Sequence, residues 1–186
     1  MVITPDGSRL FVACEGADAV LVFDTSSLRQ LGTVAIPGRP RTLLASADGK
    51  AVYAAVETAG KLAVIATADG KLVRQIDLAG GDAKVRPMGL AEAPGGRTLF
   101  VTTGRAGAVI EVDPAAGRVV RRLTAVGARP WGVAISGDGA TVVTANGPSG
   151  DISLIDRKSG AMRARYAAGV SPWGVAIAQH GAPEGT

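Results

Sequence analysis

One sequence motif recurs four times along this chain, and its spacing constrains the fold more than any other feature. The clearest copy is ARPWGVAIS at 128–136, which returns almost unchanged as VSPWGVAIA at 170–178. Weaker copies are VRPMGLAEA at 85–93 and GRPRTLLAS at 38–46. The prolines of the four copies are 47, 43 and 42 residues apart: Pro40, Pro87, Pro130 and Pro172. A period in the low forties is typical of solenoids, propellers and other repeat arrays.

Each repeat contains four runs of strand-forming residues. In the repeat that begins near residue 130, these runs are WGVAIS, TVVTANG, DISLID and AMRARYAA. They are short, rich in β-branched residues and bounded by Gly, Pro, Asp and Ser, which predicts β-strands. A D-G or G-G turn joins the first two runs of each repeat, and such a turn between apolar runs is a strong signal for a β-hairpin.

The fourth run of each repeat differs from the first three in polarity. The first three are almost continuously apolar, as expected of strands that are covered on both faces. The fourth runs carry several arginines: Arg74, Arg121, Arg122, Arg163 and Arg165. Charged side chains are typical of exposed edge strands. Four antiparallel strands per repeat, apolar inside and charged outside, predict an all-β fold of the β-propeller type. A β-sandwich is the alternative, but it would not repeat its turns at a fixed interval.

The repeats also define the predicted blades. The repeats start near residues 1, 40, 87 and 130, a last inner strand covers 173–178, and a C-terminal tail covers 179–186. Aligning ITPDG at 3–7 with ISGDG at 135–139 places Met1 inside an inner strand, so we expect a truncated or incomplete chain. About four blades would then form an open arc with apolar end faces. Because exposed apolar surface drives association, we expect missing blades or self-association.

The repeats resemble a known family. The motifs P-x-G-V-A-I-S-x-D-G, T-A-N-G and I-S-L-I-D resemble the YVTN-type, WD40-like β-propeller repeats of bacterial and archaeal extracytoplasmic proteins. Residues 141–177 and the long connection at 78–89 look like the C-terminal part of the propellers associated with pyrroloquinoline-quinone (PQQ)-dependent catabolism. The resemblance covers essentially the whole chain. It implies a seven-bladed propeller, of which this chain is a fragment, in the periplasm or at the cell surface.

Composition and charge argue against several classes of function. The net charge is +4, and Lys and Arg are scattered rather than clustered, which argues against nucleic-acid binding. No apolar run approaches the roughly 20 residues of a membrane helix, and the N-terminal MVITPDG does not have the pattern of a signal peptide. The single cysteine, Cys14, excludes an internal disulfide. It lies in an apolar run, where we expect a small buried residue.

Potential catalytic or metal-binding side chains have simpler explanations. Asp24, Asp113 and Asp156 end the third runs and could bind a metal. An aspartate in such a place more often accepts hydrogen bonds from the backbone of the following turn. The aspartates of the D-G turns are interpreted in the same way: Asp6, Asp48 and Asp138. His180 is the only histidine, and no nucleophile and base are arranged around it as a catalytic triad requires. We therefore predict no catalytic residue, no metal and no cofactor.

The remaining candidate site is one rim of the predicted central channel. The residue after each proline would lie on this rim, and arginines before three of the prolines would make it positive. The residues expected beside the rim are Glu15, Glu57, Arg105 and Asn146. The predicted rim comprises Arg39, Arg41, Arg86, Met88, Arg129, Trp131, Trp173 and Asn146. Trp and Arg are frequent at binding hot spots, so the rim is a candidate site for a ligand or partner. Alternatively, the two tryptophans fill the gaps between adjacent blades.

From these features we predict a non-catalytic binding or accessory module rather than an enzyme. It would bind a protein partner or a small anionic or aromatic ligand on the channel rim. The resemblance adds an extracytoplasmic location and an association with quinoprotein-type metabolism. The alternative is part of a propeller enzyme or cofactor-binding domain, either lactonase-like or haem-carrying as in nitrite reductases. Turnover of lactones or binding of haem by the protein would favour this alternative.

Overall fold

The structure is a computed structural model that describes residues 1–178. Four antiparallel sheets of four strands each follow one another along the chain. Blades 1 and 2 consist of β1 (Val2–Ile3), β2 (Arg9–Cys14), β3 (Ala19–Asp24) and β4 (Gln30–Ala35), then β5 (Pro40–Ala45), β6 (Ala51–Val56), β7 (Lys61–Ala66) and β8 (Leu72–Asp77). Blades 3 and 4 consist of β9 (Leu90–Glu92), β10 (Leu99–Thr102), β11 (Val109–Asp113) and β12 (Arg118–Leu123), then β13 (Pro130–Ile135), β14 (Thr141–Asn146), β15 (Asp151–Asp156) and β16 (Met162–Ala167).

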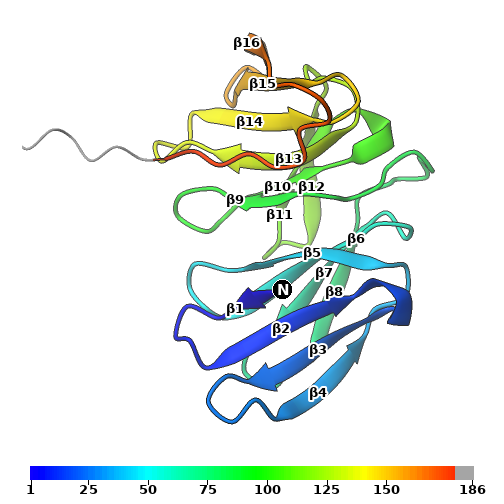
Figure 1. Cartoon of the computed structure of the whole chain (residues 1–186), viewed down its shortest axis with the longest axis vertical. Coiled ribbons are helices and arrows are strands. Elements are labelled where there is room, and N and C mark those ends of the chain that lie inside the picture. Colours follow the sequence, from blue (N-terminus) through cyan, green and yellow to red (C-terminus); the bar gives the residue numbers. More distant parts are fainter. Residues whose placement is uncertain (179–186) are drawn as a thin grey trace, which may run out of the picture.

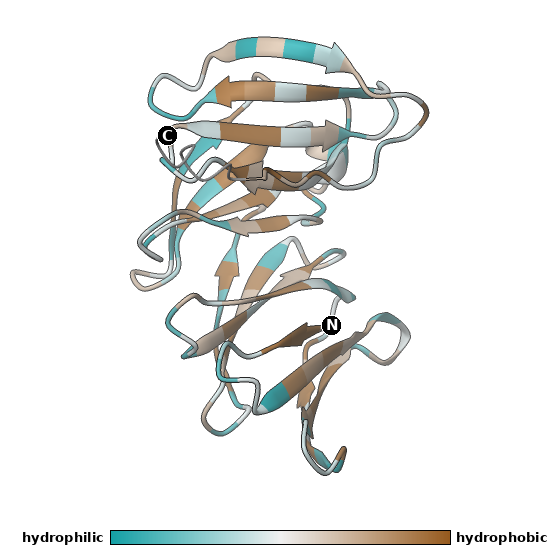
Figure 2. Ribbon diagram, turned by 60° about the vertical axis from the view of Figure 1, so that its left-hand side comes forward, coloured by the Kyte–Doolittle hydropathy of each residue, from teal (hydrophilic) through white to brown (hydrophobic). Residues whose placement is uncertain are grey.

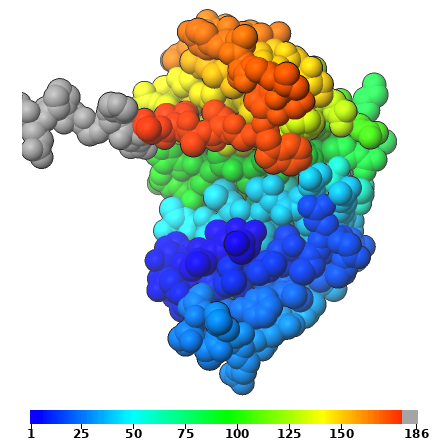
Figure 3. Space-filling model, viewed as in Figure 1, coloured from blue at the N-terminus to red at the C-terminus, as the bar shows by residue number. Residues whose placement is uncertain are grey.

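The blades form an open arc of a β-propeller, which confirms the fold predicted from the repeat. Figure 1 shows them fanning out in chain order, from blade 1 at the bottom to blade 4 at the top. The space-filling view shows the same order as successive layers (Figure 3). The only helices in residues 1–178 are two 3-10 turns, η1 (Glu15–Ala17) and η2 (Gly104–Ala106). Neither is long enough to cross a membrane.

Each pair of adjacent blades encloses its own apolar core. Blades 1 and 2 bury Phe11 and Ile65 between them, and blades 2 and 3 bury Leu62 and Leu99. The core between blades 3 and 4 contains Phe100, Val142 and Ile155, among others. Successive residues of a strand point to opposite faces of the sheet, so the covered strands of blades 2 and 3 each contribute to two cores. This requirement explains why the first three runs of each repeat are almost continuously apolar.

The outermost strand of each blade is exposed, as predicted from its arginines. Most residues of β4, β8, β12 and β16 are exposed or half-buried. In Figure 2 the topmost strand, β16, alternates hydrophilic and weakly hydrophobic residues, whereas β14 and β15 beneath it are mostly hydrophobic.

The aspartates of the turns accept backbone hydrogen bonds, as predicted. Asp24 and Asp156, at the ends of third strands, accept from the N–H groups of Ser27 (2.8 Å) and Ser159 (2.7 Å). In the D-G turns, the corresponding bonds run from Ser8, Lys50 and Ala140 to Asp6, Asp48 and Asp138. Asp113 accepts from the N–H of Ala116 at 2.9 Å. These bonds account for the carboxylates at the ends of the third strands without a metal.

The inner strands approach one another closely along the channel. A side chain at Gly89 would overlap the carbonyl oxygen of Trp131, and a Cβ at Gly132 would lie 2.9 Å from the Cα of Gly174. The hydroxyl of Thr102 in blade 3 donates to the Trp131 carbonyl of blade 4 at 2.8 Å. The glycine after Trp131 and its counterparts therefore allow backbone to pack on backbone at the axis.

Two expectations need adjustment. Residues 173–178, expected to form a last inner strand, are not in a hydrogen-bonded sheet, although their backbone runs beside β13 (Figure 1). Cys14 is half-buried rather than buried. Its edge of β2 is only partly covered, because β1 pairs only with Leu10 and Phe11. The tail at 179–186, with His180, lies outside the described residues.

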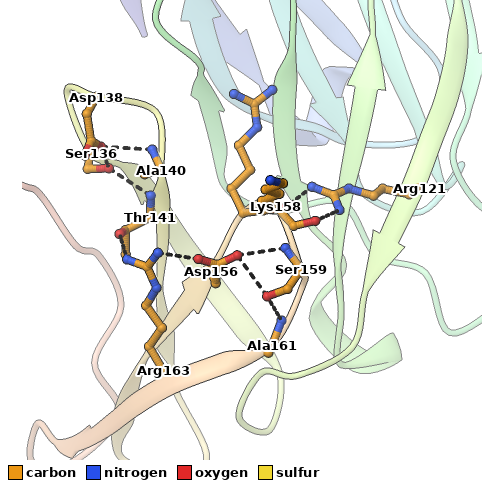
Figure 4. A network of polar contacts seen from close by, with 11 residues as sticks. Arg121, Ser136, Asp138, Ala140, Thr141, Asp156, Lys158, Ser159, Ala161 and Arg163 are labelled. Atoms are coloured by element: carbon orange, nitrogen blue, oxygen red, sulfur yellow. Dashed lines mark hydrogen bonds and ion pairs between the residues drawn. The ribbon is translucent and has the colours of Figure 1, made fainter.

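A buried carboxylate links blades 3 and 4 on the outer side of the arc. Glu111 of β11 has a side chain that is only 7% exposed, and it accepts from Arg121 at 2.6 Å and from Arg157 at 2.9 Å. Arg121 also donates to the carbonyl of Lys158 in the next blade at 3.0 Å (Figure 4). Arg157 lies 5.2 Å above the ring of Phe100. Together these contacts form an ionic clamp between the two blades.

Candidate functional site

A cavity at the mouth of the channel brings together most of the predicted rim. It has a volume of about 150 Å³ and is lined by residues from blades 2, 3 and 4 and from the segment after β16. The lining residues are Arg41, Glu57, Arg86, Met88, Gly104, Arg105, Arg129, Trp131 and Trp173. Some of them lie at the start of the first strand of a blade or in the loop that leads into it. The others lie in the loop that joins the second strand of a blade to the third. Both kinds of loop open on the same face of a propeller, so the repeat brings these residues together at the mouth of the channel.

Glu57 is the carboxylate of this cavity. It follows β6, and its side chain is 16% exposed. Arg41 Nη1 lies 2.9 Å and Arg39 Nη1 lies 3.5 Å from Glu57 Oε2. Within residues 1–178, no hydrogen bond or ion pair reaches the second carboxylate oxygen, Oε1. Glu57 therefore keeps one oxygen available to a water molecule or a ligand.

Glu15, the equivalent residue of blade 1, extends this ionic network. It accepts from Arg39 Nε at 2.9 Å and lies 3.4 Å from Arg41 Nε. The two arginines thus bridge two carboxylates and hold Arg41 at the edge of the cavity. Arg39 takes part in this network but does not line the cavity.

Three lining arginines have no carboxylate partner in the described part of the chain: Arg86, Arg105 and Arg129. Arg86 donates to the carbonyl of Thr58 at 3.3 Å, which fixes its position without neutralising its charge. Positive charge in the cavity therefore exceeds the negative charge of Glu57. Guanidinium groups bind carboxylates and phosphates through two parallel hydrogen bonds, so the arrangement suits an anion.

Aromatic side chains form one wall of the cavity. The rings of Trp131 and Trp173 lie 4.8 Å apart at an angle of 46°, and the guanidinium of Arg41 lies 5.5 Å from the ring of Trp173. Trp173 is 58% exposed. Trp131 rests against Gly147, where any side chain would overlap its ring. The wall therefore presents an apolar surface beside the arginines.

The loops that carry this site have an unusual backbone conformation. Arg39, Arg129 and Ser171 all have positive φ angles, 66°, 50° and 50°, and each precedes a repeat proline. In the first of these loops, Asp18 Oδ1 accepts from the backbone N–H of Arg39 at 2.8 Å and of Gly38 at 3.2 Å. Such conformations are costly for residues other than glycine and collect at functional sites.

The structure separates the predicted rim residues into two groups. Arg41, Arg86, Met88, Arg129, Trp131 and Trp173 line the cavity together. Asn146 does not, because its side chain is fully buried and donates to Asp151 at 2.6 Å and to Ser153 at 2.9 Å. Glu57 and Arg105, which follow second strands and were expected beside the rim, line the cavity themselves. The residue type at this position varies among the repeats, so the repeat predicts where these side chains lie but not their chemistry.

No group of three or more His, Cys, Asp or Glu side chains gathers at any point in residues 1–178. The chemistry that the described cavity offers is therefore that of one carboxylate, several guanidinium groups and an indole surface.

Comparisons with known proteins agree on the fold. A family model described as "Lactonase, 7-bladed beta-propeller" matches residues 1–84. No curated protein matches the chain. Among solved structures, hydrazine synthase of Kuenenia stuttgartiensis is 24% identical with a TM-score of 0.79, over 88% of this chain and 47% of that one. The U3-55K structure is 17% identical with a TM-score of 0.73, over 89% of this chain and 50% of that one. These two similarities show the fold alone.

A third structure is similar in sequence as well. The periplasmic gluconolactonase PpgL of Pseudomonas aeruginosa is 29% identical with a TM-score of 0.76, over 92% of this chain and 54% of that chain. The present chain spans about half the length of each of these solved structures.

These findings correct the functional prediction from the sequence. A non-catalytic binding module was expected, but a lactonase family model matches the first two blades and a gluconolactonase is similar over almost the whole chain. The prediction of a module without enzymatic function was therefore wrong, and the lactonase-like alternative has the better support. The absence of a side-chain nucleophile paired with a base does not exclude hydrolysis, because water can act as the nucleophile. The chain is a β-propeller similar to lactonases.

Proposed function

We propose that this chain forms part of a lactonase-like propeller enzyme that hydrolyses a lactone in the cavity at the channel mouth. The observation that carries the proposal is the cavity itself, in which Glu57 faces a cluster of arginines beside a tryptophan wall. The similarity to a lactonase family over residues 1–84 supports it further, because that region contains Glu57, Arg39 and Arg41.

Glu57 would act as the general base. Lactone hydrolysis begins when water attacks the carbonyl carbon, and a carboxylate that accepts a proton from this water lowers the barrier. Both arginine contacts of Glu57 fall on Oε2, so Oε1 can accept that proton. The ring C–O bond then breaks, the proton passes to the departing ring oxygen, and the product is a hydroxy acid.

The arginines would stabilise the charge that develops in this reaction. Attack of water places a negative charge on the former carbonyl oxygen, and hydrogen-bond donors aimed at that oxygen stabilise the transition state. Arg86, Arg105 and Arg129 line the same cavity as Glu57 and are not neutralised by carboxylates among the described residues. The same side chains would hold the carboxylate of the product.

Trp131 and Trp173 would form the apolar surface on which the lactone ring lies. An indole face excludes water on one side of the ring and orients its carbonyl toward the charged side of the cavity. The cavity of about 150 Å³ has room for a small lactone rather than a macromolecule, so a small ligand is favoured over a protein partner at this point.

A periplasmic location is part of the proposal and is supported by the similarity to the periplasmic gluconolactonase of P. aeruginosa. The motifs at 141–177 that resemble PQQ-associated propellers are consistent with this setting. Oxidation of a cyclic hemiacetal yields a lactone, so an alcohol-oxidising reaction of the quinoprotein class would supply the substrate.

The decisive experiment is a pH-stat assay of the purified protein with 1,5-gluconolactone, γ-butyrolactone and an acidic lactone, each corrected for spontaneous hydrolysis. We expect turnover of at least one of them. Changing Glu57→Gln should lower kcat by about 10²–10⁴-fold, the typical contribution of a general base. The product hydroxy acid should also quench tryptophan fluorescence, because both tryptophans line the cavity.

The matched control is Asp69→Asn. Asp69 is an exposed carboxylate of the same blade that lies outside the cavity, and its hydrogen bond and ion pair are with Lys71. Removing its charge should therefore leave kcat unchanged. A folded protein that hydrolyses none of these lactones, or a Glu57→Gln variant with parental kcat, would disprove the assignment.

A further inference from the structure

A second cavity lies between blades 3 and 4, on the face opposite the mouth of the channel. It has a volume of about 640 Å³ and lies between β12 on one side and the β13–β14 and β15–β16 turns on the other. These turns open on the opposite face because consecutive antiparallel strands alternate in direction. We call this cavity the outer groove. All of its lining residues lie within 111–163, in two blades of four strands each, so it does not depend on either end of the chain.

The outer groove carries more positive than negative charge. Two carboxylates line it, Glu111 and Asp156, together with four cationic side chains: Arg121, Arg157, Lys158 and Arg163. The cations therefore exceed the carboxylates by two charges. Such an excess in a groove attracts anions.

Both carboxylates are already engaged by partners within the protein. Glu111 accepts from one arginine at each of its oxygens. Asp156 Oδ1 accepts from the N–H of Ser159 at 2.7 Å and from its hydroxyl at 2.8 Å, and Oδ2 accepts from Arg163 (Figure 4). These bonds, that of the Ser159 N–H first, hold the pKa of Asp156 well below its usual range. The two carboxylates therefore stay ionised and hold the arginines in place.

Several donors of the outer groove remain available to a ligand. Within residues 1–178, no hydrogen bond or ion pair reaches the ammonium of Lys158, Nη1 of Arg157 or Nε of Arg163. Val120, which is 46% exposed, adds apolar surface beside them. The groove thus combines two unmatched positive charges with a small apolar wall.

Comparison with the junction between blades 1 and 2 shows that the fold does not require these cations. The equivalent groove of that junction has a volume of only about 190 Å³. The residues at the four positions equivalent to the cations are uncharged: Gly32, Thr67, Ala68 and Val73.

The junction between blades 2 and 3 separates a structural role from the rest. Of the four equivalent positions, one carries a cation there, Arg74, which corresponds to Arg121. Arg74 donates to the carbonyl of Ala115 in the next blade at 2.9 Å, just as Arg121 donates to the carbonyl of Lys158. This bond between blades explains Arg121. The other three cations have no counterpart at either junction, so the repeat gives them no structural explanation.

We propose that the outer groove binds a small organic dianion, a phosphate monoester or a dicarboxylate, through Arg157, Lys158 and Arg163. Guanidinium and ammonium groups recognise both kinds of anion. The carbon skeleton of the ligand lies against Val120. Because the groove and the cavity at the channel mouth are on opposite faces, this site is separate from the one proposed for lactone hydrolysis.

Isothermal titration calorimetry of the whole chain with phenyl phosphate and with succinate tests the site. At least one of them should bind at low ionic strength, and added salt should weaken the binding because the groove is open to solvent. The double variant Lys158→Ala/Arg163→Val replaces both cations by the residues of blade 2 and removes the two excess charges. It should raise the Kd about tenfold, the effect of losing charge-assisted hydrogen bonds, while circular dichroism remains unchanged.

The matched control is Lys50→Ala/Lys71→Ala. These two exposed lysines belong to turns of blade 2 and pair with Asp48 and Asp69. Their removal lowers the net charge by the same amount outside the outer groove, so the Kd should stay the same.

Tryptophan fluorescence distinguishes the two cavities. The chain has two tryptophans, and both line the cavity at the channel mouth. A dianion in the outer groove should therefore leave their emission unchanged. Emission that titrates with the same Kd as the calorimetric heat would assign the binding to the channel mouth and overturn the proposal.

Three other results would also overturn it. One is the absence of binding by both phenyl phosphate and succinate. Another is a Kd that Lys158→Ala/Arg163→Val leaves at the parental value. The last is an equal rise in Kd in the control variant, which would mean that net charge alone attracts the anion. Tighter binding of phenyl phosphate than of succinate would identify a phosphate monoester as the ligand class, and the reverse order a dicarboxylate.

Discussion

Trp131 is the residue on which the shape of the candidate site depends most. It lies between Trp173 on one side and the backbone at Gly147 on the other. Three features lie together here: the positive φ of Arg129 before the repeat proline, the indole of Trp131, and the lack of room for a side chain at Gly147. A repeat position after proline can be recognised in the sequence, but the glycine that makes room for the ring belongs to a different loop. The sequence therefore predicted the tryptophan at the rim and not the surface that holds it.

Gly147→Ala should displace the ring of Trp131. Any Cβ at this position overlaps the ring, and a rigid indole cannot bend away, so the chain must shift. We expect a loss of about 1–3 kcal/mol in the free energy of unfolding, the usual cost of overpacking, together with a change in tryptophan emission. Urea denaturation followed by fluorescence measures both.

Gly16→Ala is the matched control for this substitution. A Cβ at Gly16 has no atom within 4 Å, and its φ is not positive, so stability should change by no more than about 0.5 kcal/mol. Equal effects of the two substitutions would show that Trp131 is free to move.

At the scale of strands and turns, the repeat determined nearly everything that could be predicted. Strand order, hairpin turns and exposed fourth strands all follow from residues that recur in every blade. The ionic clamp around Glu111 could not be predicted in this way. The equivalent positions in the other blades are Val22, Val64 and Leu154, so a buried carboxylate there occurs in blade 3 alone. Contacts specific to one blade leave no periodic signal.

The turn aspartates should make stability depend on pH at acid values. Hydrogen bonds from the Thr4 hydroxyl, then from the backbone and hydroxyl of Ser8, lower the pKa of Asp6 from 3.8 to about 2. The hydroxyls of Ser26 and Ser27 lower the pKa of Asp24 even further. Because these pKa values lie below those of the unfolded chain, the stabilisation is complete above about pH 4 and is lost as pH falls through about 2.

Urea denaturation at pH 5, 4, 3 and 2 checks this dependence. The free energy of unfolding should fall over the last two steps, and Asp6→Asn should make the fall shallower because one titrating group is removed. An Asp6→Asn variant with the same pH profile as the parent chain would contradict the role of this turn.

Removing the charge of Glu111 should loosen the junction between blades 3 and 4. Glu111→Gln leaves Arg121 and Arg157 without their carboxylate, and we expect a loss of about 1–3 kcal/mol, typical of hydrogen bonds to charged groups. Asp82→Asn breaks the exposed pair with Arg122 and should cost only about 0–1 kcal/mol. Thermal or urea denaturation measures the free energy of unfolding of both variants. Similar losses in this free energy would mean that the ionic clamp is no stronger than a surface ion pair.

At the scale of the whole molecule, stability is distributed unevenly along the arc. In a repeat protein each unit contacts only its neighbours, so stability is approximately a sum over units and interfaces. Blades 2 and 3 each have a covered core on both faces, whereas blades 1 and 4 have one. The burial of the second strands reflects this difference, since β6 and β10 are almost wholly buried and β2 is mostly half-buried.

Amide hydrogen exchange should therefore follow blade position. In dilute protein, the amides of β6, β7, β10 and β11 should exchange through the largest opening free energies, and those of β2, β3 and β15 more readily, because end blades can open without disturbing two interfaces. Mass spectrometry of peptides from each blade measures this directly. Uniform exchange across all four blades would mean that the arc unfolds as a single cooperative unit.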